Sequence, residues 1–284
     1  MAREKTKPKT PLVAGREMGR VLITGASAGI GAELARVFAK HGHKLALVAR
    51  SEDKLNALAD ELRFEFQTDS IVIPADLSTA KGVAGVVANL DKRKEEIDIL
   101  VNNAGVLEVG NFCDMASDEV MKLVNLNIAA LTQLTTLLLP RMVERKFGRV
   151  LNVASIAAFQ PIPTMAAYAA SKAYVLSLTE AMSEELRGTG VKLTALCPGL
   201  TDTAMVAGVK ARSATAASLP SMLLSDPKDV AKQGYSALMA GRVIQVPGIS
   251  NQVSAAWAQV TPRWLARTLT GFATRRAADW AKRP

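Results

Sequence analysis

The sequence predicts an α/β protein with a single doubly wound sheet of about seven parallel strands and helices on both faces. From Arg20 onward, short β-branched or apolar runs alternate with longer helical patterns, as in repeated βαβ units. The short runs are too continuously apolar to face water on one side. The chain has 284 residues, 49% hydrophobic and 21% charged, which suffices for one such domain.

The apolar runs and the helical periodicity locate the elements in order along the chain. The expected strands are Val21–Thr24, Lys44–Ala49, Ser70–Pro74, Ile97–Val101, Arg149–Val153, Lys192–Leu196 and Val243–Val246. The expected helices are Gly29–Lys40, Glu52–Phe66, Ser78–Asn89, Ser117–Lys146, Met165–Gly188 and Pro227–Ala240. The last helix has a clear start, because Asp226 supplies an N-cap and Pro227 a first-turn proline.

Glycines follow the first strand in a loop that runs directly into a helix, Thr24-Gly25-Ala26-Ser27-Ala28-Gly29-Ile30-Gly31. They permit a tight turn and a close approach to a pyrophosphate, while the helix N-terminus offers N–H donors and a partial positive charge. The spacing G-x-x-x-G-x-G departs from the G-x-G-x-x-G fingerprint. The placement between strand and helix still predicts a Rossmann-type dinucleotide-binding sheet.

This loop resembles the glycine motif of the short-chain dehydrogenase/reductase family, and further family motifs follow in the same order. Asn102-Asn103-Ala104-Gly105 resembles the family's NNAG, and Pro198-Gly199 followed by Thr203 resembles its PG-x-x-x-T. Four residues match the family's catalytic tetrad: Asn127, Ser155, Tyr168 and Lys172. The resemblance covers about residues 20–248. It implies an oxidoreductase that transfers hydride between a nicotinamide and a carbonyl or alcohol.

The proton-transfer chemistry also follows from the residues themselves. Tyr168 and Lys172 are four residues apart on a predicted helix, so both side chains lie on one face. A phenol beside an ammonium that favours phenolate can supply the proton that a developing alkoxide needs. Ser155, after the fifth strand, can donate a hydrogen bond to the substrate oxygen. By family resemblance, Asn127 would hold a water in a proton relay beneath Lys172.

The resemblance implies a set of cofactor contacts. Besides Tyr168 and Lys172, these are Gly25, Ser27, Ala28, Gly29, Ile30, Gly31, Arg50, Asp76, Leu77, Asn103, Ala104, Gly105, Pro198, Gly199, Thr201 and Thr203. Arg50 follows the second strand where an NAD enzyme would have a carboxylate, and a guanidinium there can pair with a 2′-phosphate. NADP is therefore expected. NAD is the alternative, because the family's second basic position is Ala28 here and Arg50 also fits a solvated helix start.

The expected substrate is a hydrophobic ketone or alcohol, or a 3-oxoacyl compound. In this family specificity comes from residues around the nicotinamide, which correspond here to Ser155, Val106, Leu107, Phe159, Gln160 and Met205. The long segment Pro198–Ser225 does not fit the strand–helix alternation, and its apolar members favour a lid over a plain connector.

Other chemistries lack their residues. A serine hydrolase would need G-x-S-x-G and a placed histidine, but only His41 and His43 exist, both near an early strand. No metal site is expected, because H-x-H has no partners at ligand spacing and Cys113 and Cys197 are far apart. Two alternatives stay open: a dinucleotide-binding sensor or scaffold without turnover, and dehydration or epimerisation through a keto intermediate, for which the chain is short.

Charge divides the chain into three parts: residues 1–19, a flexible basic tail; residues 20–250, the dinucleotide-binding catalytic domain; and residues 251–284, a basic amphipathic helical extension. The net charge of +9 comes from the two ends. The extension would dock on its own body or a neighbouring subunit, or lie on a membrane surface; nucleic-acid binding is not expected. The expected protein is a cytoplasmic homodimer or homotetramer, with peripheral membrane contact as an alternative and no spanning helix.

Overall fold

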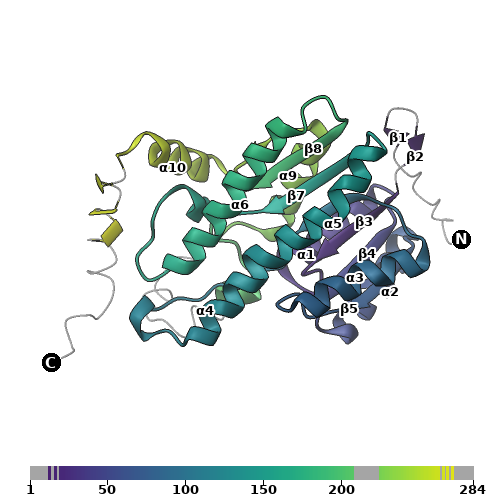
Figure 1. Ribbon diagram of the computed structural model, residues 1–284, viewed down its shortest axis with the longest axis horizontal. Coiled ribbons are helices and arrows are strands. Elements are labelled where there is room, and N and C mark those ends of the chain that lie inside the picture. The colour runs from purple at the N-terminus through teal and green to yellow at the C-terminus, as the bar shows by residue number, and fades with distance from the viewer. Residues whose placement is uncertain are drawn as a thin grey trace, which may run out of the picture.

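The computed structural model describes residues 12–13, 16–17, 19–207, 224–262, 264–265, 267–268 and 270–271. A seven-stranded sheet crosses the molecule in the order β5–β4–β3–β6–β7–β8–β9 (Figure 1), and every neighbouring pair is parallel. The strands are β3 (Arg20–Thr24), β4 (Leu45–Ala49), β5 (Ser70–Pro74), β6 (Ile97–Asn102), β7 (Gly148–Val153), β8 (Val191–Leu196) and β9 (Ile244–Gln245). The predicted α/β sheet is confirmed.

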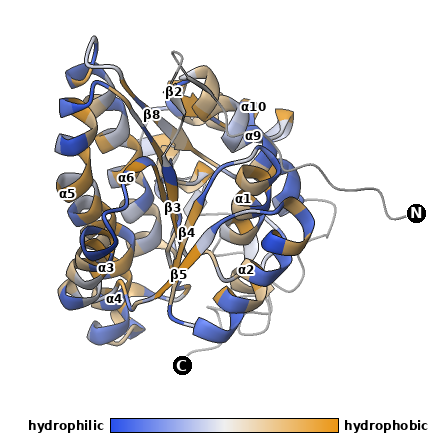
Figure 2. Cartoon of the chain, turned by 90° about the vertical axis from the view of Figure 1, so that its right-hand side faces the viewer, coloured by the Kyte–Doolittle hydropathy of each residue, from blue (hydrophilic) through white to orange (hydrophobic). Residues whose placement is uncertain are grey.

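Helices cover both faces of this sheet (Figure 2). One layer contains α1 (Gly29–Lys40), α2 (Glu52–Phe66) and α9 (Pro227–Ala240); the other contains α3 (Ala80–Arg93), α4 (Ser117–Val124), α5 (Leu131–Glu144) and α6 (Ala166–Glu185). Alternate residues of β3 enter the two cores: Val21 and Ile23 pack toward α1, and Leu22 packs toward α3 and α5. The strands are continuously apolar because both faces are buried, at about 2 kcal/mol per large side chain.

Several elements differ from the sequence expectation. The expected helix Ser117–Lys146 is one continuous run, but its middle is a π-helical turn, η2 (Asn125–Ala130). The expected start of α3 at Ser78 moves to Ala80, because the Thr79 side chain accepts a hydrogen bond from the N–H of Gly82 as N-cap. Four short elements were not expected: β1 (Leu12–Val13), paired with β2 (Arg16–Glu17), and the 3-10 turns η1 (Phe112–Asp114) and η3 (Ile156–Phe159).

The run Ser117–Glu144 is long and apolar enough to cross a membrane, by length and composition. Its apolar residues Leu134, Leu138 and Met142 are instead buried against β6 and β7 in the core of this fold. A further helix, α10 (Ile249–Val260), follows β9 and packs against η3. It lies in the extension expected to be helical, and the described residues beyond Pro262 are helical as well.

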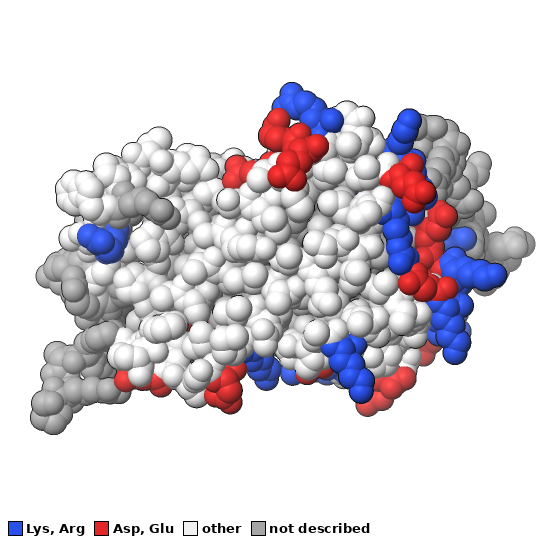
Figure 3. Space-filling view, viewed as in Figure 1, with Lys and Arg blue, Asp and Glu red and all other residues white. Residues whose placement is uncertain are grey.

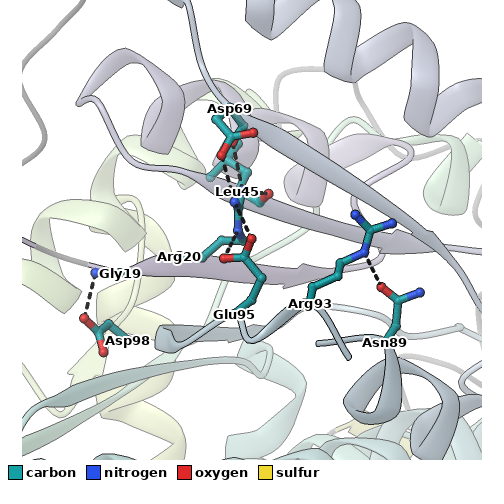
Figure 4. A network of polar contacts seen from close by, with 8 residues as sticks. All are labelled: Gly19, Arg20, Leu45, Asp69, Asn89, Arg93, Glu95 and Asp98. Atoms are coloured by element: carbon teal, nitrogen blue, oxygen red, sulfur yellow. Dashed lines mark hydrogen bonds and ion pairs between the residues drawn. The ribbon is translucent and has the colours of Figure 1, made fainter. Parts of the chain in front are cut away.

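Ion pairs hold together the amino-terminal edge of the sheet. The guanidinium of Arg20, only 4% exposed, pairs with Asp69 at 2.8 Å and with Glu95 at 2.9 Å, and it donates to the carbonyl of Leu45 (Figure 4). Nearby, the Asp98 carboxylate accepts from the N–H of Gly19. These contacts join the beginnings of β3, β4, β5 and β6, and leave the opposite edge for the site.

Candidate active site

Two connected cavities lie at the carboxyl edge of the sheet. A groove of about 640 Å³ begins at the glycine loop and passes the ends of β4, β5 and β6. A pocket of about 380 Å³ lies beyond it, between η3, α6 and the loop after β8. Both are lined by Ile30, Asn103, Gly105, Val106, Thr203 and Met205, so the groove opens into the pocket. This is the switch point between β3 and β6, where doubly wound sheets bind ligands.

The glycine loop is shaped for a phosphate. Gly25 has a φ of 66°, and a Cβ on Gly31 would lie 2.2 Å from the carbonyl oxygen of Gly25. Helix α1 begins after Ala28, which provides no side-chain cap, and its first turn contains no acidic residue. The first N–H groups of α1 therefore remain available to an anion at the groove.

A threonine and an asparagine fasten this loop to the end of β6. The Thr24 hydroxyl accepts the N–H groups of Asn103 at 2.9 Å and Ala104 at 3.0 Å. The Asn103 side-chain amide donates to the carbonyls of Thr24 and Gly25 at 2.9 and 3.2 Å. The glycine loop and the second family motif thus form one rigid wall of the groove.

The expected cofactor contacts divide between the two cavities. The groove is lined by Gly25, Ser27, Ala28, Gly29, Ile30, Arg50, Asp76, Leu77, Asn103, Ala104, Gly105 and Thr203. The pocket is lined by Tyr168, Lys172, Pro198, Gly199 and Thr201. Gly31 lines neither cavity and lies behind the loop against Gly25. Asp76 accepts hydrogen bonds from the backbone and the hydroxyl of Ser78, which lowers the pKa of its carboxyl group.

Three residues of the expected tetrad meet in the pocket. Tyr168 and Lys172 lie one turn apart on α6, and the Lys172 Nζ is 5.7 Å from the centroid of the Tyr168 ring. The same Nζ donates to the carbonyl of Val153 at 2.8 Å. Ser155 precedes η3, and its Oγ accepts the N–H of Ala157 at 3.2 Å. The strand end of β7 thus positions both the serine and the lysine.

Asn127 lies just behind the wall of the pocket. Its side chain exchanges two hydrogen bonds of 2.9 Å with the backbone of Val106, and its amide also donates to Ser171 at 3.2 Å. A Cβ on Gly105 would lie 3.1 Å from the Asn127 Oδ1 and 3.7 Å from the Lys172 Nζ. The π-turn brings Asn127 to this position, and such turns are frequent at functional sites.

Burial determines the ionisation of the pair. It raises the pKa of the Tyr168 phenol, against a smaller opposing effect of the hydrogen bond with Ser155. It lowers the pKa of Lys172 to about 8. The expectation that Lys172 favours the phenolate is thus opposed by the apolar surroundings, and Tyr168 is a protonated donor at neutral pH.

The pocket wall is mostly apolar. Val106, Leu107 and Met205 line it as expected, and Gln160 contributes a polar group. Phe159 does not line it: η3 turns the chain so that Ile156 faces the pocket while Phe159 packs on the cluster around Leu131 and Val175. Leu200 and Val206 of the expected lid segment line it as well, and three further residues contribute that were not expected: Ile156, Ile162 and Met165.

The base of the expected lid is closed by backbone contacts. Thr201 and Ser225 form a parallel bridge, and the N–H of Ser225 donates to the carbonyl of Leu200 at 2.8 Å. Residues 208–223, the remainder of the lid, lie outside the described residues.

A family model described as short chain dehydrogenase matches residues 19–214 of the chain. The chain belongs to this family. It is 37% identical to Oxidoreductase UcpA of Salmonella typhimurium over 220 residues, 74% of this chain and 83% of the relative. This short-chain dehydrogenase is therefore an oxidoreductase that acts on carbonyl or alcohol substrates.

Two solved structures resemble this short-chain dehydrogenase along nearly its whole length. A short-chain dehydrogenase from Sphingobium yanoikuyae in complex with NADPH is 30% identical, with a TM-score of 0.74, covering 94% of this chain and 99% of the other. The bulky-bulky ketone specific alcohol dehydrogenase from Comamonas testosteroni is 29% identical, with a TM-score of 0.73, covering 95% and 98%.

Several residues that line the groove in this short-chain dehydrogenase were not expected from the sequence, among them the basic residue Lys122 of α4. Ser51 and Lys54 line it together with Arg50, where β4 leads into α2. The spacing could have indicated this, because Lys54 follows Arg50 by four residues at the start of a helix and can therefore lie on the same side. The groove therefore combines basic side chains and hydroxyls with the N–H donors at the start of α1, which fits a phosphorylated dinucleotide.

Proposed function

We propose that this short-chain dehydrogenase is an NADP(H)-dependent reductase of bulky hydrophobic ketones or 3-oxoacyl compounds, or a dehydrogenase of the corresponding alcohols. The main support is that Ser155, Tyr168 and Lys172 meet in an apolar pocket that opens from the cofactor groove. Arg50, Ser51 and Lys54 support the choice of NADP, because a 2′-phosphate would gain charge-assisted hydrogen bonds there.

The chain's own residues handle the proton. When bound, the nicotinamide cofactor supplies or accepts the hydride at the carbonyl carbon. In the reductive direction, the Tyr168 hydroxyl donates its proton to the carbonyl oxygen, and Ser155 donates a hydrogen bond to the same oxygen. Lys172, held by the Val153 carbonyl, stabilises the phenolate that results until a proton from solvent restores it.

The pocket selects substrates by exclusion of water and by apolar contact. Leu107 and Val206 line it with the apolar residues named above, and Gln160 adds a polar side chain to the wall. Each methylene of a substrate buried against this wall is worth about 0.8 kcal/mol. We therefore expect kcat/KM to rise with the apolar bulk of the ketone and small sugars to be poor substrates.

The test is oxidation of NADPH, followed at the absorbance band of the reduced nicotinamide, over bulky ketones, 3-oxoacyl thioesters and small sugars. Tyr168→Phe should lower kcat by at least about a hundredfold, as loss of positioned proton transfer does. Tyr174→Phe is the matched control, because Tyr174 lies on the same helix with its hydroxyl on Thr132. Saturable NADPH binding without turnover of any compound would instead favour the sensor or scaffold.

The expected homodimer or homotetramer stays a prediction. The surface over α5 and α6 is broad and uncharged (Figure 3), and it exposes Leu137 and Tyr174, as a face covered by a second copy would. Sedimentation analysis of the intact chain and of Leu137→Glu would test it, since a charge there should dissociate such an assembly. The cytoplasmic location also stays a prediction.

A further inference from the structure

Helix α10 has two apolar faces, and only one of them packs on the protein. Ala255 and Ala258 are buried against the body. On the opposite side, Ile249, Val253 and Val260 are 80%, 64% and 80% exposed, with Trp257 between them at 50%. These four residues follow helical spacing and form one stripe, here called the outer face. Helix α10 contains no charged residue, so no charge on the helix opposes the transfer of the outer face from water to an apolar surface.

The sequence around the outer face has the composition of a membrane-interface segment. All three tryptophans of the chain, Trp257, Trp264 and Trp280, are in the last 28 residues, and Trp264 is 64% exposed. The same 28 residues contain six Lys or Arg and only Asp279 as an acid. Tryptophan prefers the headgroup region of a bilayer, and basic residues add attraction to anionic lipids.

Helix α10 also lies beside the substrate pocket, with its buried side toward the body. Helix α10 packs against η3, whose residues Ile156 and Ala157 line that pocket. Beyond α10, the Thr270 hydroxyl donates to the carbonyl of Pro161 at 3.3 Å, between the pocket residues Gln160 and Ile162. Both α10 and Thr270 are therefore next to residues of the pocket wall.

We propose that the outer face of α10 docks this enzyme on an anionic lipid surface. A second copy is the less suitable occupant, because pairing two such segments would bring together two strongly basic stretches with one acid each. Anionic headgroups neutralise the same charges while the acyl region takes up Val253, Trp257 and Val260. If the proposed function also holds, a hydrophobic substrate dissolved in the lipid would reach the pocket without crossing water.

The experiment adds vesicles of phosphatidylglycerol and phosphatidylcholine in equal parts to the full chain, with pure phosphatidylcholine as the comparison. Co-sedimentation should occur with the anionic vesicles and weaken at raised salt. Tryptophan emission should shift to the blue, and it reports on this segment alone. The double variant Val253→Ser and Val260→Ser keeps all three tryptophans and should bind at least tenfold more weakly. Phe64→Ser, at an equally exposed site on α2, should bind as wild type does.

Three results would overturn the proposal. One is no binding to anionic vesicles at low salt. Another is binding that depends on charge but is the same for the double variant, which would leave the outer face without a role. The third is a change of oligomeric state in the double variant, measured by sedimentation without lipid, which would assign the face to a second copy. None of these readouts needs a substrate, so they are independent of the proposed function.

Discussion

At the scale of single residues, Lys172 has opposite effects on activity and stability. It is a buried cation whose Nζ donates a hydrogen bond of 2.8 Å to the carbonyl of Val153. Burial lowers its pKa from 10.5 to about 8, so the unfolded chain holds the proton more tightly. The ammonium therefore costs about 3 kcal/mol of folding free energy below pH 8, and this cost disappears as the pH rises to 10.5.

Replacing this side chain by a neutral one of similar length should remove the activity and increase the stability. Lys172→Met should abolish turnover and raise the free energy of unfolding at neutral pH by about 2 kcal/mol, after about 1 kcal/mol is lost with the hydrogen bond. The gain should shrink as the pH rises above 8, as urea unfolding at several pH values would show. Lys81→Met, at an exposed site, is the control. A variant less stable than wild type at neutral pH would contradict this.

At the scale of elements, the proposed preference for NADP rests on the connection from β4 to α2. Arg50, Ser51 and Lys54 line the groove where β4 leads into α2, and under the proposed function they would bind the 2′-phosphate that distinguishes NADP from NAD. Arg50→Ala combined with Lys54→Ala should lower kcat/KM for NADPH about a hundredfold, because two charge-assisted hydrogen bonds are lost. Activity with NADH should change less than about threefold by the same argument. An equal loss with both cofactors would show that the pair has another role.

The turn from β3 into α1 tolerates no side chain at Gly31. Its Cβ would lie 2.2 Å from backbone, so Gly31→Ala must displace the loop that approaches the phosphates. We expect a lower melting temperature and at least a tenfold loss of cofactor affinity. Gly85→Ala is the matched control: a Cβ there has nothing within 4 Å, and it should stabilise α3 by about 0.5–1 kcal/mol. Unchanged cofactor binding by Gly31→Ala would contradict the close-packing argument.

The sequence predicted those features that are encoded in short local patterns, and it did not predict those that depend on tertiary contacts. Short apolar runs indicate the strands, and glycine residues indicate the loop after β3, so the positions of both could be predicted from the sequence. The π-turn at Asn127 and the packing of Phe159 depend on tertiary contacts, which no local pattern shows. Lys54 was not predicted, because it lies beyond the strand end and reaches the groove only through the first turn of α2.

At the scale of the whole molecule, the ion pairs that stabilise the sheet lie at the amino ends of its strands, and the candidate active site lies at their carboxyl ends. Arg20 and its carboxylate partners join the beginnings of four strands (Figure 4), whereas the groove and the pocket lie at the carboxyl ends of the strands. Arg20→Met should lower the free energy of unfolding by about 2 kcal/mol, since Asp69 is half exposed and part of the pairing is screened. Urea unfolding measures this loss, and kcat/KM of the folded variant should equal that of wild type. A change in kcat/KM would show that the two edges are coupled.

The position of the tryptophans divides the optical signals of the chain between two regions. Because every indole is in the last 28 residues, tryptophan emission reports on the C-terminal segment, while far-ultraviolet circular dichroism reports on the sheet and its helices. If the two unfolding curves coincide, the segment belongs to the same cooperative unit as the core. If tryptophan emission changes at a lower denaturant concentration than circular dichroism, the segment unfolds as a separate unit. The part of the pocket wall that it contacts would then open while the sheet is still folded.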